Sequence, residues 1–174
     1  MEKDHQTLIA QLLDAAKAAG ADGADAMLAR GQSTNISLRL GNVEAIERSE
    51  DFDVGLRVFF GQRTASISTS QLDDENIRSL ADRAVAMAKL APEDPFVRLA
   101  TDGEISKSIP DLDIFDNTMP DTDRLKDRAA AAEEAALSHS GIKTSDGADA
   151  GHGVVDVLIG TRNGFLAGYK RSSH

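Results

Sequence analysis

Histidine and carboxylate side chains are the groups in this chain that could hold a catalytic metal ion, because the sequence contains no cysteine. A helical zinc site of the hydrolytic type needs two histidines about one turn apart, with an adjacent glutamate that activates water. None of the four histidines lies within five residues of another, and none has a glutamate beside it: His5, His139, His152 and His174. We therefore predict no catalytic residue and no metal ligand in this chain.

One pair of these histidines could still meet in the folded chain. His139 and His152 could approach each other across a helix and a strand. The simpler interpretation is that His139 is the polar end of a helix and that His152 is a loop residue between Gly151 and Gly153.

Three polar residues are the best candidates for binding a peptide, and they are Arg57, Gln62 and Arg63. They lie on and beside a predicted hairpin. An arginine guanidinium can bind a peptide carboxylate through two parallel hydrogen bonds. It can equally form a surface ion pair with Asp51 or Asp53, and we favour this second interpretation.

Three further patterns admit a chemical and a structural interpretation. The string DGADA, at 22–26 and again at 146–150, supplies aspartates but not the twelve-residue calcium loop with its closing glutamate. The hydroxyl-rich segment 64–70 lacks the Gly-x-Ser-x-Gly elbow of a serine nucleophile, and segment 160–164 lacks the Gly-Lys-Ser/Thr ending of a phosphate loop. We predict turn carboxylates, a polar strand face and a hairpin turn. The recurrence of DGADA also leaves an internal repeat open.

The segment 51–72 predicts the hairpin that carries the arginines. Apolar residues occupy every second position from Phe52 to Phe60, which is the period of a half-buried strand. Gly61-Gln62 interrupts the run, and 64–69 form a second strand of small and β-branched residues. The apolar face of this hairpin requires a cover, and amphipathic helices at 8–19 and 73–90 are suited to it.

The remaining elements follow from periodicity and from glycine and proline. The first helix ends at Gly20, and strands are predicted at 21–31, 34–40 and 43–49, with a turn at Gly41-Asn42. With the hairpin they form an antiparallel meander of about five strands. Asp73 caps the second helix, which ends near Leu90 because Pro92 follows.

The second half of the chain starts with a proline-containing linker at 92–120. Asp121 caps a third helix, and extended segments follow at 142–150, 154–159 and 165–169. The predicted apolar stripe of that helix is Leu125, Ala129, Ala132, Ala136 and Leu137. The fold class is α+β: a mainly antiparallel sheet covered by helices at 1–91, then the linker, then the start of a second α/β unit at 121–174. A sheet left unfinished at His174 favours a truncated fragment.

Composition excludes several classes of function. The chain has 29 acidic and 19 basic residues and a net charge of −10, so binding to a nucleic-acid backbone is disfavoured. The N-terminus has no secretory pattern, and no apolar run is long enough to cross a membrane. We therefore expect a cytoplasmic protein, with no nucleic-acid and no membrane partner.

Several short segments, taken in order, resemble the N-terminal region of the TldD/PmbA family. They are SLRLGN, VEAIERS, GLRVFFGQR, SISTSQL and PEDP, followed by DLDIF, NGF and GYKRSSH, which resemble the start of the family's middle domain. The RLG, ERS, GQR and STS segments resemble the PmbA branch, also called TldE, more than the TldD branch.

The resemblance implies a role in proteolysis. In this family of metallopeptidases, a TldD-type subunit that carries zinc pairs with a PmbA/TldE-type subunit, and the heterodimer or larger assembly takes in unfolded or peptide substrates. This chain would then be the N-terminal fragment of the non-catalytic subunit, with zinc expected only in the partner. The family's name as modulator of DNA gyrase implies an alternative, a regulatory binding module that acts on such a protein target.

Overall fold

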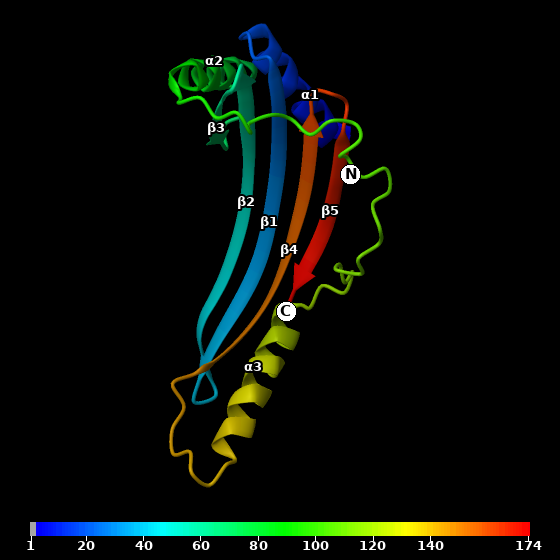
Figure 1. Cartoon of the computed structure of the whole chain (residues 1–174). Coiled ribbons are helices and arrows are strands. Elements are labelled where there is room, and N and C mark those ends of the chain that lie inside the picture. The colour runs from blue at the N-terminus through cyan, green and yellow to red at the C-terminus, as the bar shows by residue number, and fades with distance from the viewer. Residues whose placement is uncertain (1–2) are drawn as a thin grey trace. The chain divides into compact units, whose positions relative to one another are not determined.

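The computed structural model describes residues 3–174 and shows three helices and five strands in that range (Figure 1). The helices are α1 (Lys3–Ala18), α2 (Asp74–Leu90) and α3 (Thr122–Leu137), and the strands are β1 (Gly23–Arg39), β2 (Asn42–Phe60), β3 (Arg63–Thr69), β4 (Ala148–Thr161) and β5 (Leu166–Ser173). The strands form one antiparallel sheet in the order β3-β2-β1-β4-β5. The predicted α+β fold class is confirmed.

Two long strands replace four predicted short ones. Residues 23–39 form a single strand of 17 residues, and residues 42–60 form a single strand of 19 residues. Gly31 does not interrupt the first strand, because its backbone is not left-handed. A Cβ built at Gly31 would lie 4.0 Å from Cβ of Asp51, which is an ordinary contact distance. Gly31 is therefore an ordinary residue of β1, which is paired with β2 on one side.

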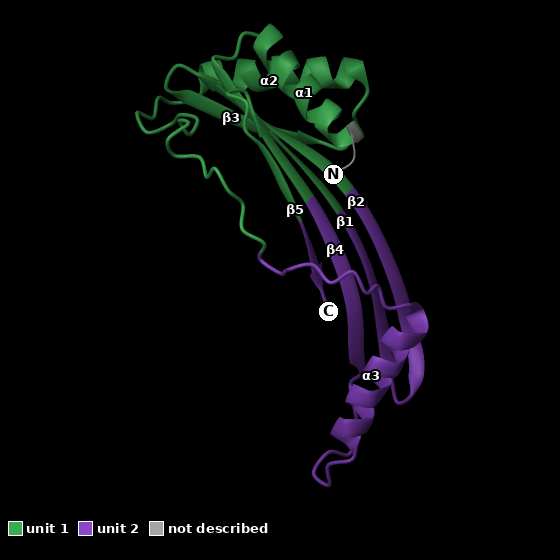
Figure 2. Ribbon diagram, turned by 90° about the vertical axis from the view of Figure 1, so that its right-hand side faces the viewer, with its two compact units in different colours: residues 1–30, 52–111, 157–169 green, residues 31–51, 112–156, 170–174 purple. Residues whose placement is uncertain are grey.

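The chain divides into two compact units, and each is built from three separate segments (Figure 2). Unit 1 comprises residues 1–30, 52–111 and 157–169, and unit 2 comprises residues 31–51, 112–156 and 170–174. The strands predicted to open a second unit, β4 and β5, are members of the same sheet as β1–β3. The domain boundaries at residues 91 and 120 stay a prediction. Residues 92–120 contain no helix or strand.

Unit 1 holds the main apolar core. Helices α1 and α2 lie on one side of its strands, and the segment that follows α2 crosses the other side (Figure 2). The alternation predicted for β2 is confirmed, because Val54, Leu56 and Val58 are all buried in this core. The core is completed by buried side chains of α1, α2, β1 and β4, among them Ile9, Leu12, Leu28, Ile77, Leu80 and Leu158.

The predicted hairpin of β2 and β3 is confirmed, and the structure gives its register. Leu56 faces Ile67 and Phe60 faces Arg63, which leaves Gly61-Gln62 as a two-residue turn. Gly61 has a φ of 58°, a left-handed value that glycine adopts without strain. The predicted caps are also present, since Asp73 Oδ1 accepts a 2.9 Å hydrogen bond from the Asn76 amide at the start of α2.

Unit 2 contains the turn between β1 and β2. The sequence predicts it at Gly41-Asn42, but the two turn residues are Leu40 and Gly41, with φ values of 48° and 77°. The carboxylate of Glu133 in α3 accepts hydrogen bonds of 2.8 Å from both turn amides. This contact favours a left-handed conformation that leucine rarely adopts.

The predicted apolar face of α3 was partly wrong, and Glu133 belongs to the buried face instead. Leu125 and Ala129 are buried as predicted, whereas Ala132 and Ala136 are exposed and Leu137 is half-buried. The third buried residue of the helix is Glu133, which is 4% exposed. A carboxylate takes the place of an apolar side chain because the two turn amides supply its hydrogen bonds.

Replacement of Glu133 by glutamine should lower the melting temperature by several degrees at pH 7. The backbone amides of α3 should also exchange faster with solvent, because the helix is held less tightly to the β1–β2 turn. The amides of Gly41 and Leu40, and then the Ser145 hydroxyl, hold the pKa of Glu133 below its usual 4.5. The ionised carboxylate therefore stabilises the fold above pH 4.5, and this stabilisation is lost as pH falls through the lower folded-state pKa.

The difference between the Glu133→Gln variant and the wild type should accordingly shrink on acidification. The matched control is Glu134→Gln, because Glu134 is the exposed neighbour on the same helix. Equal melting temperatures for the two variants at pH 7 would contradict the role assigned to Glu133.

Candidate functional site

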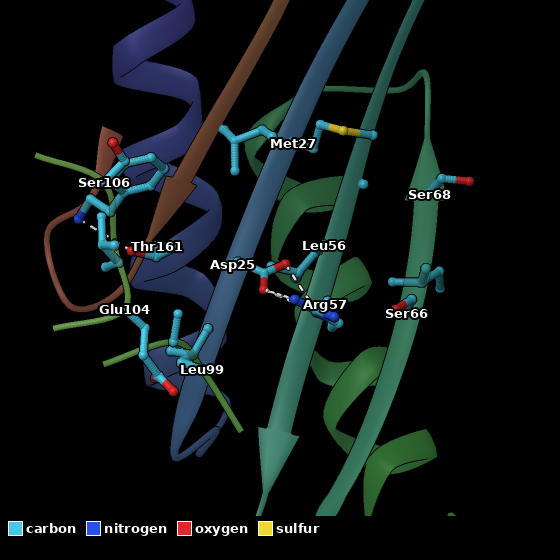
Figure 3. A pocket seen from close by; sticks show the side chains of 16 residues that line it. Asp25, Met27, Leu56, Arg57, Ser66, Ser68, Leu99, Glu104, Ser106 and Thr161 are labelled. Carbon is cyan, nitrogen blue, oxygen red and sulfur yellow. Dashed lines mark hydrogen bonds and ion pairs between the residues drawn. The ribbon is translucent and has the colours of Figure 1, made fainter. Parts of the chain in front are cut away.

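A cavity of about 740 Å³ lies in unit 1, on the face of the sheet opposite α1 and α2 (Figure 3). Four strands and the segment after α2 form its walls. The lining residues are Asp25, Met27, Gly55, Leu56, Arg57, Ser66, Ile67, Ser68, Leu99, Ala100, Glu104, Ile105, Ser106, Ile159, Thr161 and Phe165. This volume falls in the range of sites that bind small molecules or peptide side chains.

Strand alternation explains which side chains reach the cavity. In β1, Ala24 and Ala26 belong to the core beneath the helices, so Asp25 and Met27 point to the opposite face. In β2 the same alternation places Gly55 and Arg57 on the cavity side. The polar face of the hairpin, predicted from its sequence, thus becomes one wall of the cavity.

The charged groups of this wall form one ion pair. Arg57 Nε lies 2.9 Å from Asp25 Oδ2, and Arg57 Nη2 lies 2.5 Å from the same oxygen. The guanidinium carbon also lies 5.1 Å from the centre of the Phe59 ring. The surface ion pair predicted for Arg57 is present, but its partner is not Asp51 or Asp53. Asp25 takes that role because β1 and β2 are neighbours in the sheet.

A second ion pair, between Arg98 and Glu104, lies in the segment after α2 that forms another wall of the cavity. Arg98 donates hydrogen bonds of 2.6 Å to both carboxylate oxygens of Glu104. The amide and hydroxyl of Thr101 each donate a further hydrogen bond of 2.8 Å to Glu104 Oε2. The Arg98 guanidinium, followed by the Thr101 groups, holds the pKa of Glu104 far below its usual value. The carboxylate that lines the cavity is therefore ionised and already paired.

The other two predicted peptide-binding residues lie outside the cavity. Gln62 is in the exposed turn between β2 and β3, and its carbonyl accepts a 2.8 Å hydrogen bond from the amide of Asp94. Arg63 donates a 2.6 Å hydrogen bond to the carbonyl of Lys89 and pairs with Glu93 at 3.1 Å. Both residues connect the hairpin to the end of α2. Of the three candidates, only Arg57 lines the cavity.

The apolar wall was not identified from the sequence. Leu99, Ile105 and Phe165 come from segments that are distant in the chain and have no sustained period. Met27 and Ile159 belong to strands that show apolar residues on both faces. Apolar residues at the outward positions of a strand were the one available signal, because they indicate that this face is covered as well.

The histidines are arranged differently from the prediction. His152 is a buried residue of β4 and not a loop residue, and its ring centre lies 4.9 Å from that of His174, in unit 2. Burial, and then the proximity of His174, lowers the pKa of His152. His139 lies just after α3, as predicted. Across residues 3–174, no group of three or more histidine, aspartate and glutamate side chains is placed to hold a metal ion.

The aspartates of the two DGADA strings have protein partners. Asp22 accepts a 2.7 Å hydrogen bond from the amide of Gly61, and Asp149 accepts a 2.5 Å hydrogen bond from the Ser37 hydroxyl. Asp146 lies 3.9 Å from Arg39. The prediction of solvated turn carboxylates holds for Asp146, whose side chain is fully exposed, and Asp22 and Asp149 are exposed but also accept hydrogen bonds from the protein. Within the described part of the chain, no helix has the length and apolar character to span a membrane.

Comparison with protein families places the segment from β1 to α2 in a known group. Residues 24–88 match the family described as PmbA/TldA metallopeptidase domain 1. The chain is 28% identical to the Metalloprotease PmbA homolog of Haemophilus influenzae, covering 99% of this chain and 38% of that protein. It is 30% identical to Metalloprotease PmbA of Escherichia coli O157:H7, covering 88% of this chain and 34% of that protein. The chain thus spans little more than a third of these relatives' length.

Solved structures share the fold. A candidate modulator of DNA gyrase from Bacteroides thetaiotaomicron superposes with a TM-score of 0.89 at 22% identity, covering 98% of this chain and 39% of that one. TldE from Thermococcus kodakarensis superposes with a TM-score of 0.74 at 15% identity, covering 95% of this chain and 37% of that one. At these identities the superpositions establish a common fold.

Proposed function

Because this chain belongs to the PmbA/TldD metallopeptidase family, we propose that it is the N-terminal region of a non-catalytic PmbA/TldE-type subunit in a cytoplasmic peptide-processing assembly. The observation that carries the proposal is the match of residues 24–88 to the family's first domain. The similarity to PmbA over nearly the whole chain, and the fold shared with TldE, support the choice of branch.

The zinc ion of such an assembly would belong to a TldD-like partner. The residues described here do not fit a zinc site. His152 approaches His174, and His174 pairs with Asp116, but within residues 3–174 no group of three or more histidine, aspartate and glutamate side chains is placed to hold a metal ion. No step of peptide cleavage is assigned to this chain. Its contribution would be to bind the partner subunit and to present unfolded or peptide substrate to it.

The structure offers surfaces suited to that contribution. Strand β3 ends the sheet, so its outer backbone groups are available for pairing with another extended chain. The segment 92–120 exposes apolar side chains that a partner could cover, among them Phe96, Ile109, Leu112 and Met119. Arg57 lines the cavity beside β3, so it is the one of the three candidates that a peptide side chain in this cavity would contact.

A regulatory module that acts on DNA gyrase is the competing function. The candidate gyrase modulator of Bacteroides thetaiotaomicron shares the fold over 98% of this chain, and this similarity is the observation that favours the alternative. The two functions differ in the partner they require, because only the first needs a metallopeptidase subunit.

Purification of the full-length gene product from its own cells separates the two functions. We expect a TldD-like protein to co-elute, with stoichiometric zinc in that protein and cleavage of unfolded casein by the complex. Recovery of a topoisomerase without a metallopeptidase would support the regulatory module. Stoichiometric zinc in this subunit, after separation from all partners, would contradict the non-catalytic assignment.

A further inference from the structure

We infer that the cavity of unit 1 binds a large uncharged side chain of an extended polypeptide that pairs with the outer edge of β3. The inference rests on the proposed function and names the class of ligand: an unfolded segment in which apolar side chains alternate with small ones. The side chains of the bound segment that enter the cavity would lie on the sheet face that carries Arg57 (Figure 3), which is also the face of Gly55.

Gly55 provides the first observation, because it is a strand residue with open space in front of it. A Cβ built at Gly55 would meet no atom within 4 Å, and its φ lies outside the left-handed region. Neither a turn nor close packing inside the protein therefore explains the glycine. A strand glycine with space above it is typical of a place where a ligand or another backbone approaches closely.

The charges of the lining argue for an uncharged side chain. Asp25 and Arg57 neutralise each other, and Glu104 is paired with Arg98. The remaining walls are mostly apolar, with Met27, Leu99 and Phe165 from three separate segments. A charged side chain would lose its hydration here without gaining a free partner, whereas a leucine or phenylalanine side chain would exchange water for apolar contacts.

The position of β3 argues for a polypeptide and against a small free molecule. Ser66, Ile67 and Ser68 line the cavity and also belong to the last strand of the sheet. Among the described residues, no segment forms a backbone hydrogen bond with the outer edge of β3. A strand added at this edge would direct every second side chain toward the cavity face, since side chains alternate between the two faces of a sheet.

The test measures peptide binding by this 174-residue chain alone, so the result does not depend on a partner. The probe is a fluorescein-labelled peptide of alternating serine and leucine with both ends blocked. An otherwise identical serine-alanine peptide should bind about tenfold or more weakly, because it buries less apolar surface. A serine-leucine peptide methylated at every backbone amide nitrogen should lose binding, because no backbone N–H remains to pair with β3.

Gly55→Leu is the decisive variant, because its side chain would fill the cavity from the floor. We expect it to weaken binding of the serine-leucine peptide by about tenfold or more. The matched control is Gly31→Leu, a strand glycine outside the cavity that also has room for a Cβ. It should bind the peptide like the wild type. Circular dichroism would verify folding, and Gly55→Val would replace Gly55→Leu if the larger residue prevents folding.

The outcomes separate this inference from the proposed function. Unchanged affinity in the folded Gly55 variant would overturn the inference, as would equal affinity for the N-methylated peptide. Binding of N-acetyl-leucine amide as tight as that of the peptide would show a small-molecule site and would also overturn it. Each of these results leaves the co-purification of a metallopeptidase partner as a separate measurement, and failure of that experiment alone would contradict the proposed function.

Discussion

Replacement of Leu12 by alanine should reduce the free energy of unfolding by about 2–5 kcal/mol, the range for removing a fully buried leucine side chain. Leu12 lies in α1, is 0% exposed and packs in the core between the helices and the sheet. The loss combines the transfer free energy of the deleted methyl and methylene groups with the cavity they leave behind. Urea denaturation followed by circular dichroism would measure it.

Leu13→Ala is the matched control for this prediction. Leu13 is the next residue of the same helix and is only partly buried against the core. Alanine has a slightly higher helix propensity than leucine, so the helix itself loses nothing in either variant. We expect Leu13→Ala to cost clearly less than Leu12→Ala. Equal losses would show that α1 is not packed as described.

The elements of unit 1 could be predicted because local signals and tertiary packing agree there. The alternation of Val54, Leu56 and Val58 indicates one buried face, and that face is the one the helices cover. Asp73 caps α2 because its carboxylate accepts a hydrogen bond from within the next turn, an interaction that depends on sequence neighbours alone. The turn at Gly61-Gln62 is equally local.

The lengths of β1 and β2 could not be predicted, because they depend on pairing between residues distant in the sequence. Gly31 resembles a strand end when it is considered alone. In the sheet it lies beside Asp51, and the pairing of β1 with β2 continues through it. Glycine weakens a strand, but it does not end one whose backbone groups have partners.

The candidate site was only partly predictable for the same reason. Arg57 was recognisable as a polar residue on a strand, but nothing near it in the sequence indicates Asp25 as its partner. Outside the site, the predicted apolar stripe of α3 left out Glu133, because helix periodicity cannot reveal the turn amides of Leu40 and Gly41 that it binds. Such contacts between charged groups and distant backbone amides require the three-dimensional structure.

The repeated string DGADA shows how one sequence pattern can meet two physical requirements. Each copy leads into a strand, and those strands, β1 and β4, are neighbours in the sheet. A Cβ at Gly23 would lie 3.1 Å from a methyl group of the Leu99 side chain, which can move. A Cβ at Gly147 would lie 2.9 Å from the carbonyl oxygen of Leu38, which is fixed backbone in β1. The two glycines are therefore expected to differ in their tolerance of substitution.

Gly147→Ala should accordingly destabilise the protein by about 1–3 kcal/mol, as expected for a strained backbone conformation that the fold still imposes. Gly147 has a φ of 125°, a value that residues with a side chain rarely adopt. The substitution adds the close approach to the Leu38 carbonyl oxygen, and relief of that contact would shift β4 away from β1 at its first residue. Thermal and urea unfolding of the variant would measure the loss.

Gly31→Ala is the control for Gly147→Ala, because Gly31 also belongs to unit 2 but has an ordinary strand backbone and space for a Cβ. We expect its stability to change by no more than about 0.5 kcal/mol, or to rise slightly, since alanine reduces the entropy of the unfolded chain. Equal stability of the Gly147→Ala and Gly31→Ala variants would contradict this prediction. It would show that the backbone at residue 147 can move away from the Leu38 carbonyl oxygen at little cost in free energy.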